Sequence, residues 1–96
     1  MNKEERGHFF DIGSKYLIRS VTFSYLGRLK AVGDKEILID DASWVADTGR
    51  FYNTLENGIF NELSSEIEPY TDDVILGRNA IVDMVKYEHE LPKDQK

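Results

Sequence analysis

The chain has 96 residues, of which 41% are hydrophobic and 31% are charged, so it is long enough for one hydrophobic core and too apolar for a disordered chain. Its 18 acidic and 12 basic residues give a net charge of −6, which opposes a general attraction to nucleic-acid phosphates and confines any such contact to a local surface. There is no cysteine and no apolar run of about 18 residues, which favours a cytoplasmic protein without disulfides, a cysteine zinc site or a membrane span.

The first third of the chain predicts a short helix and then strands. A short helix is expected over residues 2–11, where a mixed pattern of charged and apolar residues is interrupted by Gly7. Residues 16–26 are rich in β-branched and aromatic side chains of alternating polarity, which predicts one strand. Gly27 predicts a bend or bulge, and the apolar pattern then continues over residues 28–32.

The middle of the chain predicts a turn, a third strand and a long loop. Gly33 and Asp34 favour a tight turn, because glycine tolerates positive φ and aspartate hydrogen-bonds to its own turn backbone. The apolar residues 37–39 predict the third strand. Turn-forming residues interrupt the β pattern over residues 43–65, where a long loop with one short helical turn is expected before the fourth strand.

The C-terminal part predicts the last two strands, over residues 74–76 and 80–87, joined by a tight turn at residues 77–79. The charged residues 88–96 are expected to form a flexible tail. One domain of about five short strands suggests a small, strongly bent antiparallel barrel. Periodicity alone does not distinguish an OB-like barrel from an SH3-like barrel.

Two segments resemble the two halves of the Sm and LSm signature. The first is Gly27-Arg28-Leu29, followed by the Asp34 turn and residues 37–42 (ILIDDA). The second is residues 74–82 (VILGRNAIV). Their order and separation fit this family, and the resemblance covers roughly residues 14–87. It implies a divergent Sm-like protein of bacterial or phage type, with a five-stranded SH3-like barrel.

Assembly and RNA binding are further implications of the resemblance. Sm-like barrels close a ring through their fourth and fifth strands, which implies a homo-oligomer of about five to seven subunits. The interface is then expected at the apolar residues of these strands, namely Val74, Leu76, Ile81, Val82 and Met84. Turns that line the ring would contact single-stranded RNA, through Asp34, Lys35, Glu36, Gly77, Arg78 and Asn79.

Arg78 is the strongest of these candidates, because a guanidinium in a tight turn can stack on a base or hold a phosphate bidentately. The alternative for Arg78 is an ion pair with Asp40, Asp41 or a neighbouring subunit. Glu36 falls near the position where RNA-binding members of the family carry an asparagine. A ring that serves as a structural or protein-interaction module, without nucleic acid, is therefore the alternative function.

Other aromatic residues near turns are candidates for base stacking. They are Tyr25, Trp44, Phe51, Tyr52 and Tyr70.

No catalytic site, metal site or cofactor is predicted. His8 and His89 lie at opposite ends of the chain, without acidic residues at ligand spacing. Asp40-Asp41 and Asp72-Asp73 are adjacent pairs, and successive strand residues face opposite sides, so each pair is expected to give one carboxylate to a side. The sequence contains no G-x-S-x-G, H-E-x-x-H or phosphate-binding glycine loop.

Overall fold

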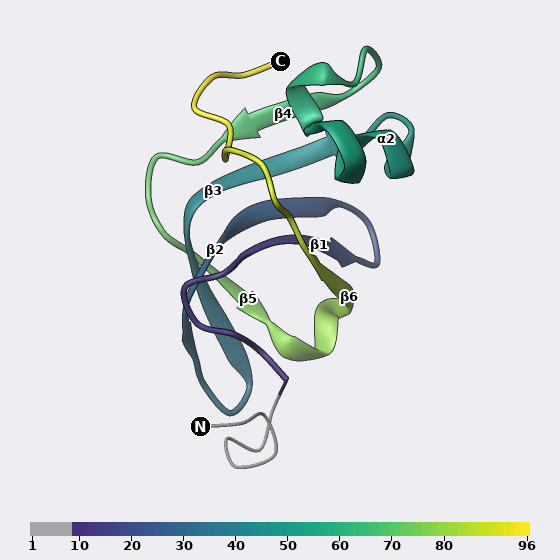
Figure 1. Cartoon of the computed structure of the whole chain (residues 1–96). Helices are drawn as coiled ribbons and strands as arrows, with labels where there is room; N and C mark the ends of the chain where they lie inside the picture. Colours follow the sequence, from purple (N-terminus) through teal and green to yellow (C-terminus); the bar gives the residue numbers. More distant parts are fainter. Residues whose placement is uncertain (1–8) are drawn as a thin grey trace.

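A computed structural model describes residues 9–96, in which six antiparallel strands form one unclosed sheet (Figure 1). The expectation of a mostly β protein is confirmed. The strands are ordered β4-β3-β2-β1-β6, and β5 also pairs with β3. The elements are β1 (Lys15–Ser20), β2 (Ser24–Val32), β3 (Glu36–Asp47), α2 (Phe51–Asn57), η1 (Ile59–Asn61), β4 (Glu66–Pro69), β5 (Val74–Gly77), η2 (Arg78–Ala80) and β6 (Ile81–Lys86).

The short helix expected over residues 2–11 falls mostly on residues 1–8, which lie outside the described part of the chain. Residues 9–14 precede β1 without regular structure. Among residues 9–96, no helix is long and apolar enough to cross a membrane.

The prediction of one strand over residues 16–26 is wrong, because this segment is the hairpin of β1 and β2. The turn is closed by Ser20, whose N–H donates to the Phe23 carbonyl oxygen at 2.9 Å. The Ser20 hydroxyl also donates to this oxygen at 2.7 Å and accepts from the Phe23 N–H at 3.2 Å. The apolar–polar alternation continues through the turn, so periodicity alone could not detect it.

The bulge predicted at Gly27 is confirmed. The register between β2 and β3 shifts between Leu26 and Arg28. A Cβ atom at Gly27 would lie 2.9 Å from Ile39 Cδ1 and 3.3 Å from the Asp40 carbonyl oxygen. Glycine therefore allows the two backbones to approach closely at this point.

The turn predicted at Gly33 is also confirmed, since the Gly33 N–H donates to the Glu36 carbonyl oxygen at 2.8 Å. The strand that follows is much longer than residues 37–39. β3 continues to Asp47, so the loop predicted over residues 43–65 begins too early. The acidic pair Asp40-Asp41 interrupts the apolar run, which concealed this continuation.

β3 holds the sheet together. One edge of β3 pairs with β2, and the other edge pairs with β5 over residues 36–39 and with β4 over residues 43–47. Between these two segments Asp41 has a φ of 46°, in the left-handed region. The strand is thus divided between two partners at a backbone position that departs from extended geometry.

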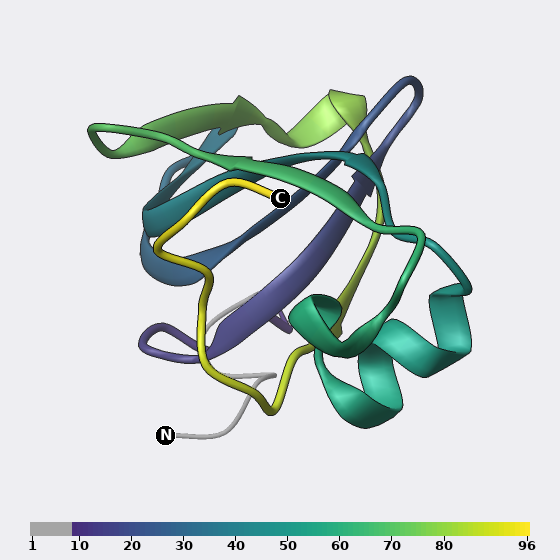
Figure 2. The same cartoon turned by 90° about the horizontal axis from the view of Figure 1, so that it is seen from above.

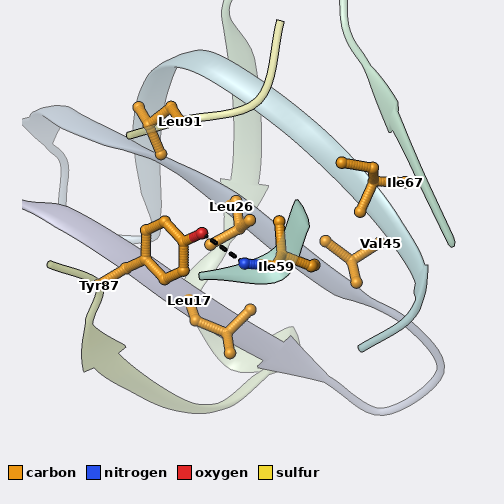
Figure 3. Close-up of a cluster of buried hydrophobic side chains, with 7 residues drawn as sticks. All are labelled: Leu17, Leu26, Val45, Ile59, Ile67, Tyr87 and Leu91. Carbon is orange, nitrogen blue, oxygen red and sulfur yellow. Dashed lines mark hydrogen bonds between the residues drawn. The ribbon is translucent and has the colours of Figure 1, made fainter. Parts of the chain in front are cut away.

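The sheet has a hydrophobic core on each face, because both faces of β1 are buried. Leu17 and Ile18 are neighbours in sequence, and both are 0% exposed. The first core consists of Leu17, Leu26, Val45, Ile59, Ile67, Tyr87 and Leu91 (Figure 3). The second core consists of Tyr16, Ile18, Leu29, Ile37, Ile39 and Ala42.

The C-terminal segment 88–96, predicted to be flexible, packs beside the first core. Leu91 is buried in this core. Ile67 and Lys96 exchange two main-chain hydrogen bonds, both of 2.9 Å. The Lys96 ammonium donates to the Phe60 carbonyl oxygen at 3.1 Å and to Ser65 Oγ at 2.9 Å. Both views of the fold show this segment ending beside β4 (Figures 1 and 2).

Candidate nucleic-acid interface

The turn between β2 and β3 contacts the corner between β5 and β6. β5 pairs with the beginning of β3, where Gly77 lies opposite Glu36. The Arg78 N–H donates to the Lys35 carbonyl oxygen at 2.8 Å. This pairing brings together the six residues predicted to contact RNA, and we call residues 34–36 and 77–79 the two-turn surface. It lies at the end of the molecule opposite to α2 and β4 (Figure 1).

The side chain of Arg78 joins the two turns. Its Nη1 donates to the carbonyl oxygens of Gly33, at 2.8 Å, and of Asp34, at 3.2 Å. Its guanidinium carbon lies 5.2 Å from the centroid of the Phe10 ring, which is a cation–π geometry. Among residues 9–96, no carboxylate forms an ion pair with Arg78. The positive charge of Arg78 therefore has only neutral partners within this part of the chain.

The rest of the two-turn surface carries charges of both signs. The side chains of Asp34, Lys35, Glu36 and Asn79 are exposed. A Cβ atom at Gly33 would lie 2.5 Å from Glu36 Oε1, so this carboxylate lies over the turn. Two cations and two carboxylates leave the surface without net charge. The two-turn surface can therefore attract a phosphate only locally, close to its two cations, Lys35 and Arg78.

A surface pocket of about 450 Å³ lies beside Arg78 and Asn79. The residues before β1 contribute Phe9, which is 78% exposed, and Phe10. The other walls come from Tyr16 on β1 and from residues Ile81, Asp83 and Met84 on β6. We call it the Phe9 pocket.

The sequence did not single out this pocket. None of the five aromatic residues proposed for base stacking lines it. The signal that could have found it is the pair of adjacent phenylalanines, Phe9 and Phe10, shortly after the charged residues 3–6.

The residues predicted for the oligomer interface fall into two groups. The side chains of Val74, Leu76, Ile81 and Met84 are partly buried and pack against the second core. Only Val82 is largely exposed, at 63%. Ile75 and Val85, which the prediction omitted, are 70% and 38% exposed. An apolar run gives no parity signal, so the sequence could not separate inward from outward side chains.

Arg28, which the sequence did not identify as functional, binds two neighbouring carboxylates. Its Nη1 lies 3.0 Å from Asp40 Oδ1 and 2.7 Å from Asp41 Oδ2. The expectation that each acidic pair gives one carboxylate to a side is therefore wrong for this pair. The left-handed backbone at Asp41 breaks the alternation of strand side chains, which brings both carboxylates to one arginine. The hydrogen bond from Arg28 holds the pKa of Asp41 below its ordinary range.

The histidines do not form a common site in the described structure. His8 lies outside the described residues, and the His89 ring Nε2 lies 2.8 Å from the Leu55 carbonyl oxygen. Asp73 of the second acidic pair binds the Lys30 ammonium at 2.8 Å. In residues 9–96, no three or more histidine, aspartate or glutamate side chains lie close enough together to hold a metal ion.

No protein-family model matches the chain, and neither does any curated protein or solved structure.

Proposed function

We propose that this chain is an Sm-like protein that assembles into a homo-oligomeric ring and binds single-stranded RNA at the two-turn surface. The observation that carries the proposal is the contact of Arg78 with the turn at Gly33 and Asp34. It connects the two halves of the Sm-like motif in space and leaves the guanidinium with neutral partners. A guanidinium whose charge is not balanced by a carboxylate can hold a phosphate or stack on a base.

The strand pairing supports an SH3-like barrel. Without β4, five strands follow one another along the path β6-β1-β2-β3-β5. The first and last strands of this path, β6 and β5, are joined by the three residues of η2. The two ends of the sheet must therefore lie close together at this corner, as in a bent sheet that is almost closed. β4 is then an addition to the barrel, on the far half of β3.

The edges of β5 and β6 support assembly. Within residues 9–96, β5 pairs only with β3 and β6 only with β1, so each strand has an edge available for another chain. Ile75 on β5 and Val82 on β6 are largely exposed apolar side chains. Pairing of β5 from one subunit with β6 from the next is a head-to-tail contact, which generates a ring when the rotation closes.

Assembly would also allow a chain with a net charge of −6 to bind RNA, although this charge opposes a general attraction to phosphates. A single subunit offers RNA only the cations Lys35 and Arg78 on the two-turn surface. A ring repeats this pair in each subunit around one axis. A single strand that contacts several subunits gains affinity from effective concentration, without stronger contacts in any one of them.

The test is a titration of labelled uridine-rich and adenine-rich RNA strands of equal length, followed by fluorescence anisotropy at several salt concentrations. We expect binding that weakens with salt, because contacts with phosphates release counterions. Arg78→Ala is expected to weaken binding and reduce the salt dependence. Arg50→Ala removes the same charge from an exposed position next to α2, at the far end of the molecule, and is expected to change neither.

The stability of each variant separates an RNA contact from a structural one. Arg78→Ala removes hydrogen bonds between the turns, which is expected to cost about 1 kcal/mol in the free energy of unfolding. Arg78→Lys keeps the charge and is expected to retain most of the salt dependence. A protein that forms a ring but binds neither strand at low salt would contradict the proposal and favour the structural or protein-interaction module.

A further inference from the structure

We infer that the Phe9 pocket is a nucleobase-binding site, in which one base of a bound RNA strand inserts between Phe9 and the Arg78–Asn79 turn. This inference rests on the proposed function and adds a site that the sequence motifs do not contain. The pocket volume of about 450 Å³ is in the range of small-ligand sites.

The walls of the pocket suit a flat aromatic ligand. Phe9 is 78% exposed, which is unusual for a phenylalanine, and offers its ring to the solvent at the edge of the pocket. The Arg78 guanidinium lies over the Phe10 ring, 5.2 Å from its centroid, so one face of this cation already contacts an aromatic ring. Aromatic rings and guanidinium planes are the surfaces on which proteins stack unpaired bases.

The edge of the pocket supplies hydrogen-bonding groups. Asn79 is exposed, and its amide carries both donors and an acceptor, as the edge of a base requires. The Asp83 carboxylate, also at the pocket, accepts hydrogen bonds from Arg19 Nε at 2.9 and 3.1 Å. Because Arg19 balances the charge of Asp83, this carboxylate repels a nearby phosphate less than an isolated one would.

The position of the pocket fits a nucleotide better than an aromatic side chain of a protein. Arg78 belongs both to the pocket and to the two-turn surface. On that surface Lys35 is its neighbour, because the Arg78 N–H donates to the Lys35 carbonyl oxygen. A base in the pocket therefore places its own phosphate within reach of cations that lack carboxylate partners among the described residues. A peptide side chain brings no such charge.

The experiment compares RNA strands with an abasic strand of equal length, which carries the same phosphates but no bases. We expect the protein to bind the base-containing strands about 5- to 150-fold more tightly, the range for stacking one base. Phe9→Ala is expected to remove most of this difference and to leave the salt dependence unchanged. Phe60→Ala truncates a 44% exposed phenylalanine on η1 and serves as the matched control, for which the difference is expected to persist.

The outcomes separate this inference from the proposed function. Equal, salt-dependent binding of abasic and base-containing strands would overturn the nucleobase site and leave the RNA-binding proposal standing. Base-dependent binding that Phe9→Ala and Asn79→Ala do not change would also overturn it. No binding of any strand would contradict both proposals, and would leave the pocket to another ligand class, such as an aromatic side chain of a protein partner.

Discussion

Arg28 of β2 and Asp41 of β3 form an ion pair of 2.7 Å, and the aspartate has a left-handed φ of 46°. Non-glycine residues adopt this conformation at a cost that the surrounding structure must offset. Here the same arginine also binds Asp40, 3.0 Å away. Residues 27–29 on β2 and residues 40–42 on β3 are thus connected physically, by a bulge and by an ion pair.

The first prediction concerns the pKa of Asp41. The hydrogen bond from Arg28 lowers it, so this pair stabilises the folded protein above about pH 3.9, the unfolded value. The stabilisation is lost as the pH falls through the lower, folded pKa. NMR titration of the side-chain carboxyl carbons should give a low pKa for Asp41, which Arg28→Ala returns to the ordinary range. Arg50→Ala should leave it unchanged, and an ordinary pKa in the unmodified protein would contradict the pairing.

The second prediction concerns the close approach at Gly27. A Cβ atom there would lie 2.9 Å from Ile39 Cδ1 and 3.1 Å from Ile39 Cβ, and Ile39 is fully buried. Gly27→Ala is therefore expected to lower the free energy of unfolding by about 1–3 kcal/mol, as overpacking does. At Gly77 no atom lies within 4 Å of the added Cβ, so Gly77→Ala should change stability by less than about 0.5 kcal/mol. Denaturant unfolding of both variants checks the difference, and equal effects would refute it.

The third prediction concerns the first core. The hydroxyl oxygen of Tyr87, which is 2% exposed, accepts a hydrogen bond of 2.9 Å from the buried Ile59 N–H (Figure 3). Tyr87→Phe leaves this N–H without a partner, which should cost about 1–3 kcal/mol. Tyr52→Phe, at a residue that is 67% exposed, is the control and should be nearly neutral. Thermal unfolding that is the same for both variants would contradict this anchoring role of Tyr87.

Elements marked by a glycine or by an apolar run could be predicted from the sequence. The bulge at Gly27 and the turn at Gly33 follow from the freedom of glycine, and the structure contains both. The hairpin turn after Ser20 and the continuation of β3 beyond Asp41 were missed. In the first case a serine side chain closes a turn within an alternating pattern. In the second, an ion pair holds two acidic residues inside a strand.

The sequence could identify the residues of the two turns, but it could not identify the Phe9 pocket. The residues of the two turns are consecutive in sequence, so a motif could identify them, and the pairing of Gly77 with Glu36 brings them together. The Phe9 pocket combines residues from before β1, from β1, from η2 and from β6. β6 pairs with β1, with Met84 opposite Ile18, and this pairing brings walls of the pocket together from distant parts of the chain. No local pattern records a pairing between strands so far apart in the chain.

The fourth prediction concerns assembly through β5 and β6. Light scattering at micromolar concentration should give a mass of several subunits, since the proposed ring shares the exposed strand edges. Val82→Lys, at a largely exposed residue of β6, is expected to reduce the mass toward that of one chain. Leu63→Lys changes a residue that is 96% exposed near η1 and should leave the mass unchanged. A monomer in the unmodified protein would contradict the ring.

Photocrosslinking distinguishes single-stranded RNA bound on the two-turn surface from RNA bound elsewhere on the molecule. A uridine-rich strand with photoreactive bases would be bound at low salt and irradiated, and the attached peptides would be identified by mass spectrometry. We expect crosslinks at Phe9 and Phe10, at Lys35 and around Arg78, and we expect all of them to weaken as salt rises. Crosslinks confined to α2, β4 or the C-terminal segment, at the other end of the molecule, would contradict it.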